Sequence, residues 1–177
     1  MVKIRPATFA DAAPLAALAE RTFRDTFADE NSQEDMNIHC ANNYSSEIQL
    51  RELSDPLRVT ILAEVDESLA GFAQLLLRSA THCLSSNSPS ELNRLYVLRE
   101  WHGRRVAHEL MNAVLSTAAQ RKSEHVWLGV WERNPKAIAF YRKFGFAVIS
   151  EHSFVLGTEP QRDLVMSVQI NAPSTAA

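Results

Sequence analysis

Glu91-Leu92-Asn93-Arg94-Leu95-Tyr96-Val97 decides the fold, together with the basic turn Trp101-His102-Gly103-Arg104-Arg105 that follows it. The apolar run over 92–97 predicts a strand. After the turn, one apolar face recurs at helical spacing and predicts a helix that packs against a sheet; its members are Ala107, Leu110, Met111, Val114, Leu115 and Ala118. Residues 126–131 are apolar on both faces, as expected of a strand buried between two layers.

The basic turn predicts a site for an anion. Arg99, Arg104 and Arg105 are opposed only by Glu100, and His102 and His108 lie beside them. The first N–H groups of a helix have no partner within the helix, and the helix dipole also favours negative charge there. A polyphosphate is therefore the kind of ligand that this turn suits.

A second block runs from Asn134 to Phe146 and reads Asn-Pro-Lys-Ala-Ile-Ala-Phe-Tyr-Arg-Lys-Phe-Gly-Phe. Asn134 predicts a helix cap with Pro135 at the first helical position, and Gly145 predicts the helix end. Spacing alone favours Tyr141 as a core tyrosine with a satisfied hydroxyl.

Working outward, the pattern predicts one α/β domain with a mixed, mostly antiparallel sheet flanked by helices. Asp11 predicts the cap of a first helix. The other elements are strands at 2–6, 59–65, 71–77, 146–149 and 163–170, a helical region at about 32–53, a loop at 79–90 and a flexible tail at 171–177.

Both blocks, in this order, resemble the GNAT superfamily of N-acetyltransferases. The N-x-x-A-x-x-F-Y-x-x-x-G-F pattern of that family matches at each defined position from Asn134 to Phe146. The family's R/Q-x-x-G-x-G/A turn matches less well over 102–107, because His102 replaces its first residue and Arg105 its central glycine. The resemblance implies an N-acetyltransferase domain over residues 1–170 with acetyl-CoA as co-substrate.

The resemblance also implies the site residues. The cofactor would be held by Leu95, Tyr96, Val97, His102, Gly103, Arg104, Arg105, Val106, Ala107, His108, Asn134 and Tyr141. In the family the strand splays from its neighbour, so amides near Leu95 and Val97 meet the pantetheine arm. Asn134 resembles a pantetheine contact, although helix capping alone explains it.

Two residues are expected to be catalytic. The family's tyrosine, here Tyr141, donates to the coenzyme A sulfur. Because tyrosine has a pKa near ~10 and a thiol near ~8.5, full proton transfer is uphill by roughly 2 kcal/mol, and a hydrogen bond to the developing thiolate is favoured. Glu91 resembles the family's frequent glutamate that deprotonates the amine; an exposed charge at a strand end explains it equally well.

Arg105 is the main departure from the family. A glycine there allows positive φ and close approach to phosphate, whereas arginine adds charge and up to five donors. With helical φ and ψ at residue 105, the amides still face the pyrophosphate. The alternative is a degenerate turn that no longer binds; the surrounding positive charge favours retained binding.

Composition excludes several classes of function. The chain has 177 residues and a net charge of −3, which disfavours a nucleic-acid binder. There is no apolar run of membrane-spanning length and no secretory signal, and Cys40 and Cys83 have no close pairing. We expect a cytoplasmic protein without a metal site. With no nucleophile elbow and no Walker loop, acetyl transfer is expected to be direct, in a ternary complex.

The acceptor is expected to be the primary amine of a small molecule. Between 25 and 50 the chain has no Lys or Arg and six acids, which suit a polycation; they are Asp25, Asp29, Glu30, Glu34, Asp35 and Glu47. With the phrase over 157–164, this region resembles the spermidine/spermine acetyltransferase branch. A solvated helix face is at least as good an explanation. A non-catalytic acyl-CoA-binding regulator and a protein or peptide N-acetyltransferase stay open, and the resemblance favours a homodimer.

Overall fold

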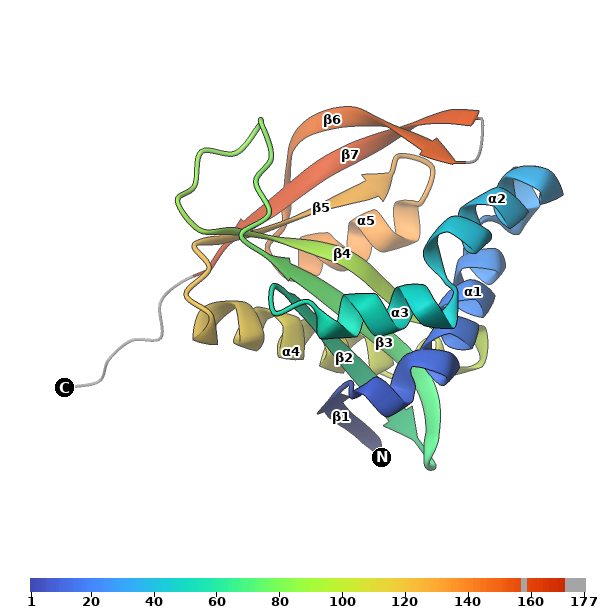
Figure 1. The fold of residues 1–177 in the computed structure, drawn as a ribbon. Coiled ribbons are helices and arrows are strands. Elements are labelled where there is room, and N and C mark those ends of the chain that lie inside the picture. The colour runs from blue at the N-terminus through green and yellow to red at the C-terminus, as the bar shows by residue number, and fades with distance from the viewer. Residues whose placement is uncertain (157–158, 171–177) are drawn as a thin grey trace.

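A seven-stranded sheet organises the computed structural model, which describes residues 1–156 and 159–170. The strand order is β1-β2-β3-β4-β5-β7-β6 (Figure 1). The strands are β1 (Val2–Pro6), β2 (Arg58–Val65), β3 (Ser68–Leu77), β4 (Pro89–Val97), β5 (His125–Trp131), β6 (Ala147–Leu156) and β7 (Glu159–Gln169). Neighbouring strands pair antiparallel except β4 and β5, which are parallel. The predicted α/β fold with a mostly antiparallel sheet is confirmed.

Helices cover both faces of the sheet. They are α1 (Ala12–Phe27), α2 (Gln33–Asn43), α3 (Ser46–Ser54), α4 (Val106–Gln120) and α5 (Pro135–Lys143), with 3-10 turns at Phe9–Asp11, Ala28–Glu30 and Arg99–Trp101. The α4 and α5 helices lie on one face, and α1 to α3 lie on the other (Figure 1). None of the described helices is long and apolar enough to cross a membrane.

Strand alternation in β4 sends side chains to two separate cores. Leu95 and Val97 pack with the α4 residues Leu110 and Val114 on one face. Tyr96 packs on the other face, in a cluster that includes fully buried residues of α1 and β3. Because successive side chains of a strand point to opposite faces, one strand contributes to both sides of the sheet.

The middle of the sheet is split. The parallel pairing of β4 with β5 covers only Pro89, Ser90 and Glu91. Beyond it, β4 carries a bulge at Asn93, which has no partner in the register with β3. A bulge bends its strand, and Figure 1 shows β4 and β5 running together at their starts and then fanning apart. The two strands therefore enclose a wedge at the centre of the sheet.

The helical region predicted at about 32–53 is divided into two helices, α2 and α3. Ser45 breaks the region with extended dihedral angles, φ −71° and ψ 156°, and its hydroxyl accepts a hydrogen bond from the Ile48 amide at 3.2 Å. Serine at a helix cap satisfies one of the free amides of the next helix. The break places the Tyr44 side chain in the core, where it is 5% exposed. The predicted tail 171–177 lies outside the described residues.

The predicted caps are largely confirmed. Asn134 accepts a hydrogen bond from the Ala137 amide at 3.1 Å, and Gly145 has φ +85° at the end of α5. Asp11 lies at the start of α1, but its carboxylate does not cap that helix. It accepts hydrogen bonds from Arg5 Nη2 at 2.8 Å and from the Thr8 amide at 2.7 Å.

Candidate active site

A cavity of about 1190 Å³ passes through the wedge between β4 and β5. It is lined from one face of the sheet by the start of α4 and by α5, and from the other face by α1 and α2. A typical site for one small ligand measures roughly 300–1,000 Å³. The volume, and walls formed from both faces of the sheet, therefore suit a pair of ligands that meet inside the sheet.

The start of α4 offers amides without partners. The Glu109 amide donates to the Arg105 carbonyl at 3.0 Å, and no side chain caps the helix. The three preceding residues, Val106, Ala107 and His108, all line the cavity. Unpaired helix amides at a cavity wall form a site for a phosphate group, as the basic turn predicts.

Arg105 has a backbone conformation that glycine adopts more readily than other residues. Its φ is 66° and its ψ is 1°, in the left-handed region, so the right-handed helical geometry considered above does not occur. For an L-residue with a Cβ this conformation costs about 1–2 kcal/mol. The side chain is 75% exposed, with Nη2 3.9 Å from Glu109 Oε1. The turn thus keeps its shape, and the arginine adds a charge at its outer edge.

The split leaves backbone groups of β4 facing the wedge. Leu98 donates to the Ala70 carbonyl at 2.9 Å, and the register pairs Tyr96 with Phe72. Hydrogen-bonded pairs alternate along an antiparallel ladder. Tyr96 therefore bonds toward β3, while the N–H and C=O groups of Leu95 and Val97 point toward the wedge. His102 Nε2 lies 2.9 Å from the Val97 carbonyl, which leaves both amides and the Leu95 carbonyl for a ligand.

Tyr141 reaches the same wedge from α5. It lines the cavity and packs against Phe146, with ring centroids 5.8 Å apart. Burial, followed by the neighbouring Tyr96, raises the pKa of Tyr141 above its usual range. A phenol with a raised pKa stays protonated at neutral pH. Tyr141 therefore has the chemistry of a hydrogen-bond donor at this position.

Aromatic side chains line the opposite opening of the cavity. His39 stacks on Phe23 with ring centroids 4.1 Å apart, and Phe27 lies 5.8 Å from Trp131. Burial, with help from the Arg94 charge, lowers the pKa of His39 to about 4, so the ring is neutral at pH 7. A side-chain hydrogen bond joins Tyr44 to Tyr96. This end of the cavity therefore suits an organic acceptor with apolar parts.

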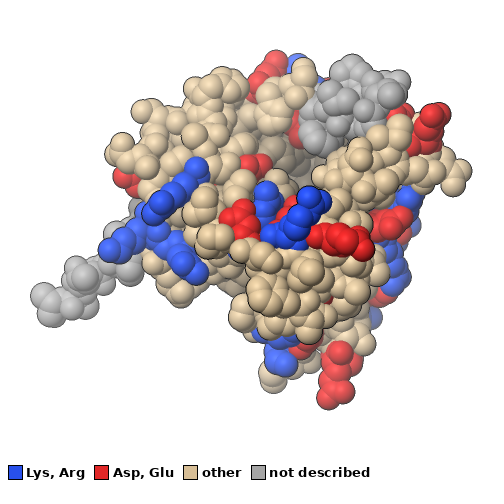
Figure 2. Space-filling view, in the orientation of Figure 1, with Lys and Arg blue, Asp and Glu red and all other residues tan. Residues whose placement is uncertain are grey.

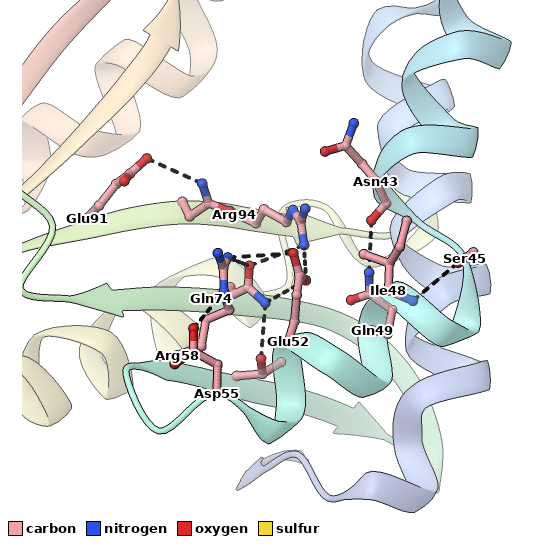
Figure 3. Close-up of polar contacts among 12 residues, drawn as sticks. Asn43, Ser45, Ile48, Gln49, Glu52, Asp55, Arg58, Gln74, Glu91 and Arg94 are labelled. Carbon is pink, nitrogen blue, oxygen red and sulfur yellow. Dashed lines mark hydrogen bonds and ion pairs between the residues drawn. The ribbon is translucent and has the colours of Figure 1, made fainter.

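A polar network fixes Arg94 in that wall. Its Nη1 donates to Glu52 Oε2 at 2.6 Å and to Gln74 Oε1 at 3.2 Å, and its guanidinium lies 5.2 Å from the Tyr44 ring centroid. Arg58 Nη1 lies 3.6 Å from Glu52 Oε1. Figure 3 shows these side chains pointing toward one another between α3 and the sheet. The sequence analysis missed Arg94 as a cavity residue, although a charge inside an apolar strand was a signal.

Two predicted site residues lie outside the cavity wall. Glu91 accepts hydrogen bonds from Ser79 Oγ at 2.8 Å and Asn93 Nδ2 at 3.3 Å, and it does not line the cavity. The Arg104 guanidinium lies 5.1 Å from the Trp101 ring centroid. Every other predicted cofactor residue, Tyr141 included, lines the cavity.

The acids predicted to attract a polycation are mostly elsewhere. Asp25 lines the cavity, and Asp29 does not. Glu34 and Asp35 occupy the first turn of α2, and Glu47 occupies the first turn of α3, where negative charge favours the helix dipole. Figure 2 shows acidic side chains scattered among basic ones on this face, without a continuous acidic surface over α2 and α3.

One acid that the sequence analysis did not select lies in the cavity wall. Asp163 lies within β7, at the last position where β7 pairs with β5; it is opposite Trp131 of β5 and His152 of β6. Its signal in the sequence was an acid that precedes the apolar run 164–166. Within the described chain, no group of His, Cys, Asp and Glu residues has the arrangement of a metal site.

The chain is similar to known proteins along most of its length. Residues 15–146 match the model of the acetyltransferase (GNAT) family. An uncharacterised N-acetyltransferase of Mycobacterium tuberculosis strain H37Rv is 35% identical over 156 residues, which cover 88% of this chain and 96% of that protein. One from Lactobacillus delbrueckii subsp. lactis is 29% identical over 165 residues, covering 93% of this chain and 95% of that protein.

Solved structures share the fold. PaiA N-acetyltransferase of Thermoplasma acidophilum, in complex with coenzyme A, has a TM-score of 0.77 at 22% identity and covers 96% of this chain and 99% of its own. YncA of Salmonella typhimurium, with its cofactor acetyl-CoA, has a TM-score of 0.69 at 17% identity, covering 100% and 98%. The predicted fold, superfamily and enzyme class are confirmed: the chain belongs to the acetyltransferase (GNAT) family.

Proposed function

We propose that this protein transfers the acetyl group of acetyl-CoA to the primary amine of a small molecule, by direct attack in a ternary complex. Membership of the acetyltransferase (GNAT) family supports the reaction class. The observation that carries the proposal is the single cavity that joins the α4 amides, the wedge and the aromatic wall. Such a cavity lets an acyl donor and an acceptor enter from opposite faces and meet within the sheet.

The donor half of the site follows from the residues at the wedge. The α4 amides and the positive turn would hold the pyrophosphate. The Leu95 and Val97 amides would pair with the pantetheine arm and polarise the thioester carbonyl, as oxyanion donors do. Since its pKa is raised by burial, Tyr141 would donate a hydrogen bond to the leaving sulfur rather than surrender its proton.

Within the class of small amines, a polyamine is the specific acceptor that we would test first. Asp25 and Asp163, the two carboxylates of the cavity wall, support it, because they could each meet one ammonium group of a polycation. The positive charge of Arg94 in the same wall disfavours binding of a polycation. The comparison of spermidine with phenylethylamine as acceptors separates an acceptor recognised by charge from one recognised by its apolar body.

The first test is Tyr141→Phe, which removes one hydroxyl and keeps the ring. Turnover of acetyl-CoA with the better of the two amines is expected to fall about 10²–10³-fold, because one donor to a developing negative charge is lost. The affinity for acetyl-CoA, measured by calorimetry, is expected to stay within about threefold. Thiol release measures turnover in both proteins.

The outcomes separate the competing functions. Micromolar binding of acetyl-CoA without turnover of any amine or peptide would favour a non-catalytic regulator. Mass spectrometry that finds acetyl groups on peptide lysines or N-termini but not on small amines would favour a protein N-acetyltransferase.

Location and assembly belong to the same proposal. We place the protein in the cytoplasm, a view supported by its two unpaired cysteines, Cys40 and Cys83. A homodimer is supported by the exposed apolar residues Val148 and Ile149 on the edge strand β6, which are 43% and 39% exposed. Light scattering on the purified protein tests the dimer directly.

A further inference from the structure

Asp163 is a carboxylate with an incomplete set of hydrogen-bond partners at the cavity wall. Among the described residues, its Oδ1 is buried and accepts no hydrogen bond. Most buried polar atoms of native proteins are paired, and an unpaired one is costly. Asp163 as a whole is only partly buried and lines the cavity, so its incompletely paired carboxylate is a suitable partner for an ammonium group that arrives with a substrate.

Gly129 allows this carboxylate to lie over β5. A Cβ at residue 129 would stand 3.3 Å from Asp163 Oδ2 and 3.3 Å from His152 Cε1. The missing side chain therefore opens the space in which Asp163 and His152 lie. Gly129 belongs to the part of β5 beyond its pairing with β4, so the carboxylate lies beside the wedge.

The position connects Asp163 with the groups that hold the acetyl donor. Tyr96 of β4 is close enough to Asp163 for the carboxylate charge to raise the pKa of Tyr96. In the same way, Tyr96 is close enough to Tyr141 of α5 to raise the pKa of Tyr141. These three side chains come from three elements and line one cavity. Asp163 is opposite Trp131 of β5, and the Trp131 ring lies 5.8 Å from that of Phe27 in α1. Side chains directly opposite in a sheet share a face, so the carboxylate lies on the α1 side of the cavity.

Glu91, the base expected from the sequence, has a different environment. Its two oxygens already accept hydrogen bonds from Ser79 and Asn93, and it lies outside the cavity wall. The comparison favours Asp163 over Glu91 for contact with the acceptor.

We propose that Asp163 is the catalytic residue that binds the acceptor ammonium and receives its proton. The assignment rests on the proposed function and deepens it. Burial raises the pKa of Asp163 above the usual range for an aspartate, although the charge of His152 opposes that shift. A base works best when its pKa approaches the working pH, so the environment improves Asp163 in this role.

The step balances without a further reactant. The ammonium gives one proton to Asp163, and the freed lone pair forms a C–N bond to the thioester carbonyl carbon. When the tetrahedral intermediate collapses, the C–S bond breaks and the sulfur leaves as a thiolate, stabilised by Tyr141. The nitrogen loses its second proton and the thiolate gains one, so one net proton passes from Asp163 to water.

Several groups near Asp163 affect its titration. His152 of β6 is opposite it, Tyr96 of β4 is close enough for the two charges to interact, and β5 contributes the bare backbone of Gly129. The cavity wall holds further titratable or charged side chains, namely Asp25, His39, Tyr44, Arg94, Arg99, His102, Arg105, His108, Arg133, Lys136, Tyr141 and Lys143. His39 is neutral across the useful range because its pKa is lowered to about 4.

The decisive experiment is the pH profile of kcat/KM for Asp163→Asn, with phenylethylamine and spermidine as acceptors. In the natural protein kcat/KM is expected to fall as pH drops through the raised pKa of Asp163 and to be level above it. The variant can use only the free amine, so its kcat/KM should rise tenfold per pH unit toward the amine pKa near ~10. At pH 7 the variant should lose roughly 10²–10³-fold.

Controls separate this inference from the proposed function. Glu151→Gln removes an exposed acid, because the Glu151 side chain, next to His152 in sequence, is 57% exposed. The pH profile of kcat/KM for this variant should match that of the natural protein. An unchanged affinity of Asp163→Asn for acetyl-CoA shows that the variant is folded. A level profile in Asp163→Asn, or loss of the acid limb in Glu91→Gln instead, overturns the assignment while the proposed function stands.

Absence of turnover in the natural protein with every amine counts against the proposed function. The assignment is then tested by calorimetric binding of phenylethylamine to the protein saturated with coenzyme A. The natural protein should bind the amine, and Asp163→Asn should bind at least tenfold more weakly. Equal binding by both proteins overturns the assignment.

Discussion

The two faces of the sheet carry different kinds of buried side chains. Under α4 and α5 the core is apolar, with Leu110, Met111 and Val114 fully buried against the strands. Under α1 to α3 the buried set includes Gln49, Gln74 and Thr60, beside the ion pair of Arg94 with Glu52. The first face supports the basic turn before α4, and the second supports the aromatic wall of the cavity.

The difference separates what packing provides from what recognition requires. An apolar core holds a helix start in place without selecting a ligand. Most buried polar groups have a partner, and such pairs fix side chains such as Arg94 and Glu52 in one arrangement. We infer that the shared cofactor chemistry lies over the apolar face and the specific acceptor chemistry over the polar face.

The largest effect on stability is expected from Glu52→Ala, which breaks the polar face. It leaves Arg94, whose side chain is 10% exposed, without its carboxylate. Removing one partner of a buried pair typically costs about 3–5 kcal/mol of the free energy of unfolding. Urea denaturation measures the loss, and the acceptor KM should rise while the Kd for acetyl-CoA stays unchanged.

A matched variant, Glu52→Gln, keeps a hydrogen-bond acceptor and removes the charge. Its loss should be smaller than that of the alanine variant. Equal losses would mean that the side-chain volume of Glu52 matters and its pairing with Arg94 does not.

A somewhat smaller effect, about 3 kcal/mol, is expected from Leu110→Ala on the apolar face. Leu110 is fully buried, and truncation of such a leucine leaves a cavity that the surroundings fill only partly. Stability alone should change, because Leu110 lies outside the cavity wall. A change in the acceptor KM in this variant would contradict the inference that only the polar face affects recognition of the acceptor.

The smallest effect is expected from Arg105→Gly at the cofactor turn. Glycine relieves the left-handed strain at φ 66° but adds freedom to the unfolded chain. The free energy of unfolding should rise by no more than about 1 kcal/mol, and the calorimetric Kd for acetyl-CoA should change less than about fivefold, because an exposed charge contributes little.

Arg105→Ala is the companion variant, since it removes the charge and keeps the strained backbone. If both variants bind acetyl-CoA more weakly by the same factor, the loss is due to the missing charge of Arg105. Binding that appears only in the glycine variant would mean that the natural turn has lost its function.

The sequence predicted the helices α4 and α5 well because their signals are local. A cap at Asn134, a helix end at Gly145 and an apolar stripe on α4 each depend on residues within a few turns of one another. The break between α2 and α3 was missed, since Ser45 lies within a run that otherwise has helical composition. The left-handed Arg105 was also missed, because local propensity assigns that conformation to glycine.

The acceptor side depends on long-range contacts. The pairing of β7 with β5 and β6 places Asp163 in the cavity wall. Arg94 donates a hydrogen bond to Glu52, which is 42 positions away in sequence. No local pattern reports that Glu91 is satisfied by Ser79 or that Asp163 Oδ1 is without a partner. Such differences between two acids arise only from tertiary packing.

The short pairing of β4 with β5 also makes the fold depend on its ligand. Only Pro89 to Glu91 join the two halves of the sheet directly along that seam. Local opening there should cost less than global unfolding. A molecule that fills the wedge acts as the missing length of strand, and its binding free energy adds to the stability of the native state. At a concentration of 100 times its Kd this linkage amounts to about 2.7 kcal/mol, so the melting temperature reports how well the wedge is filled.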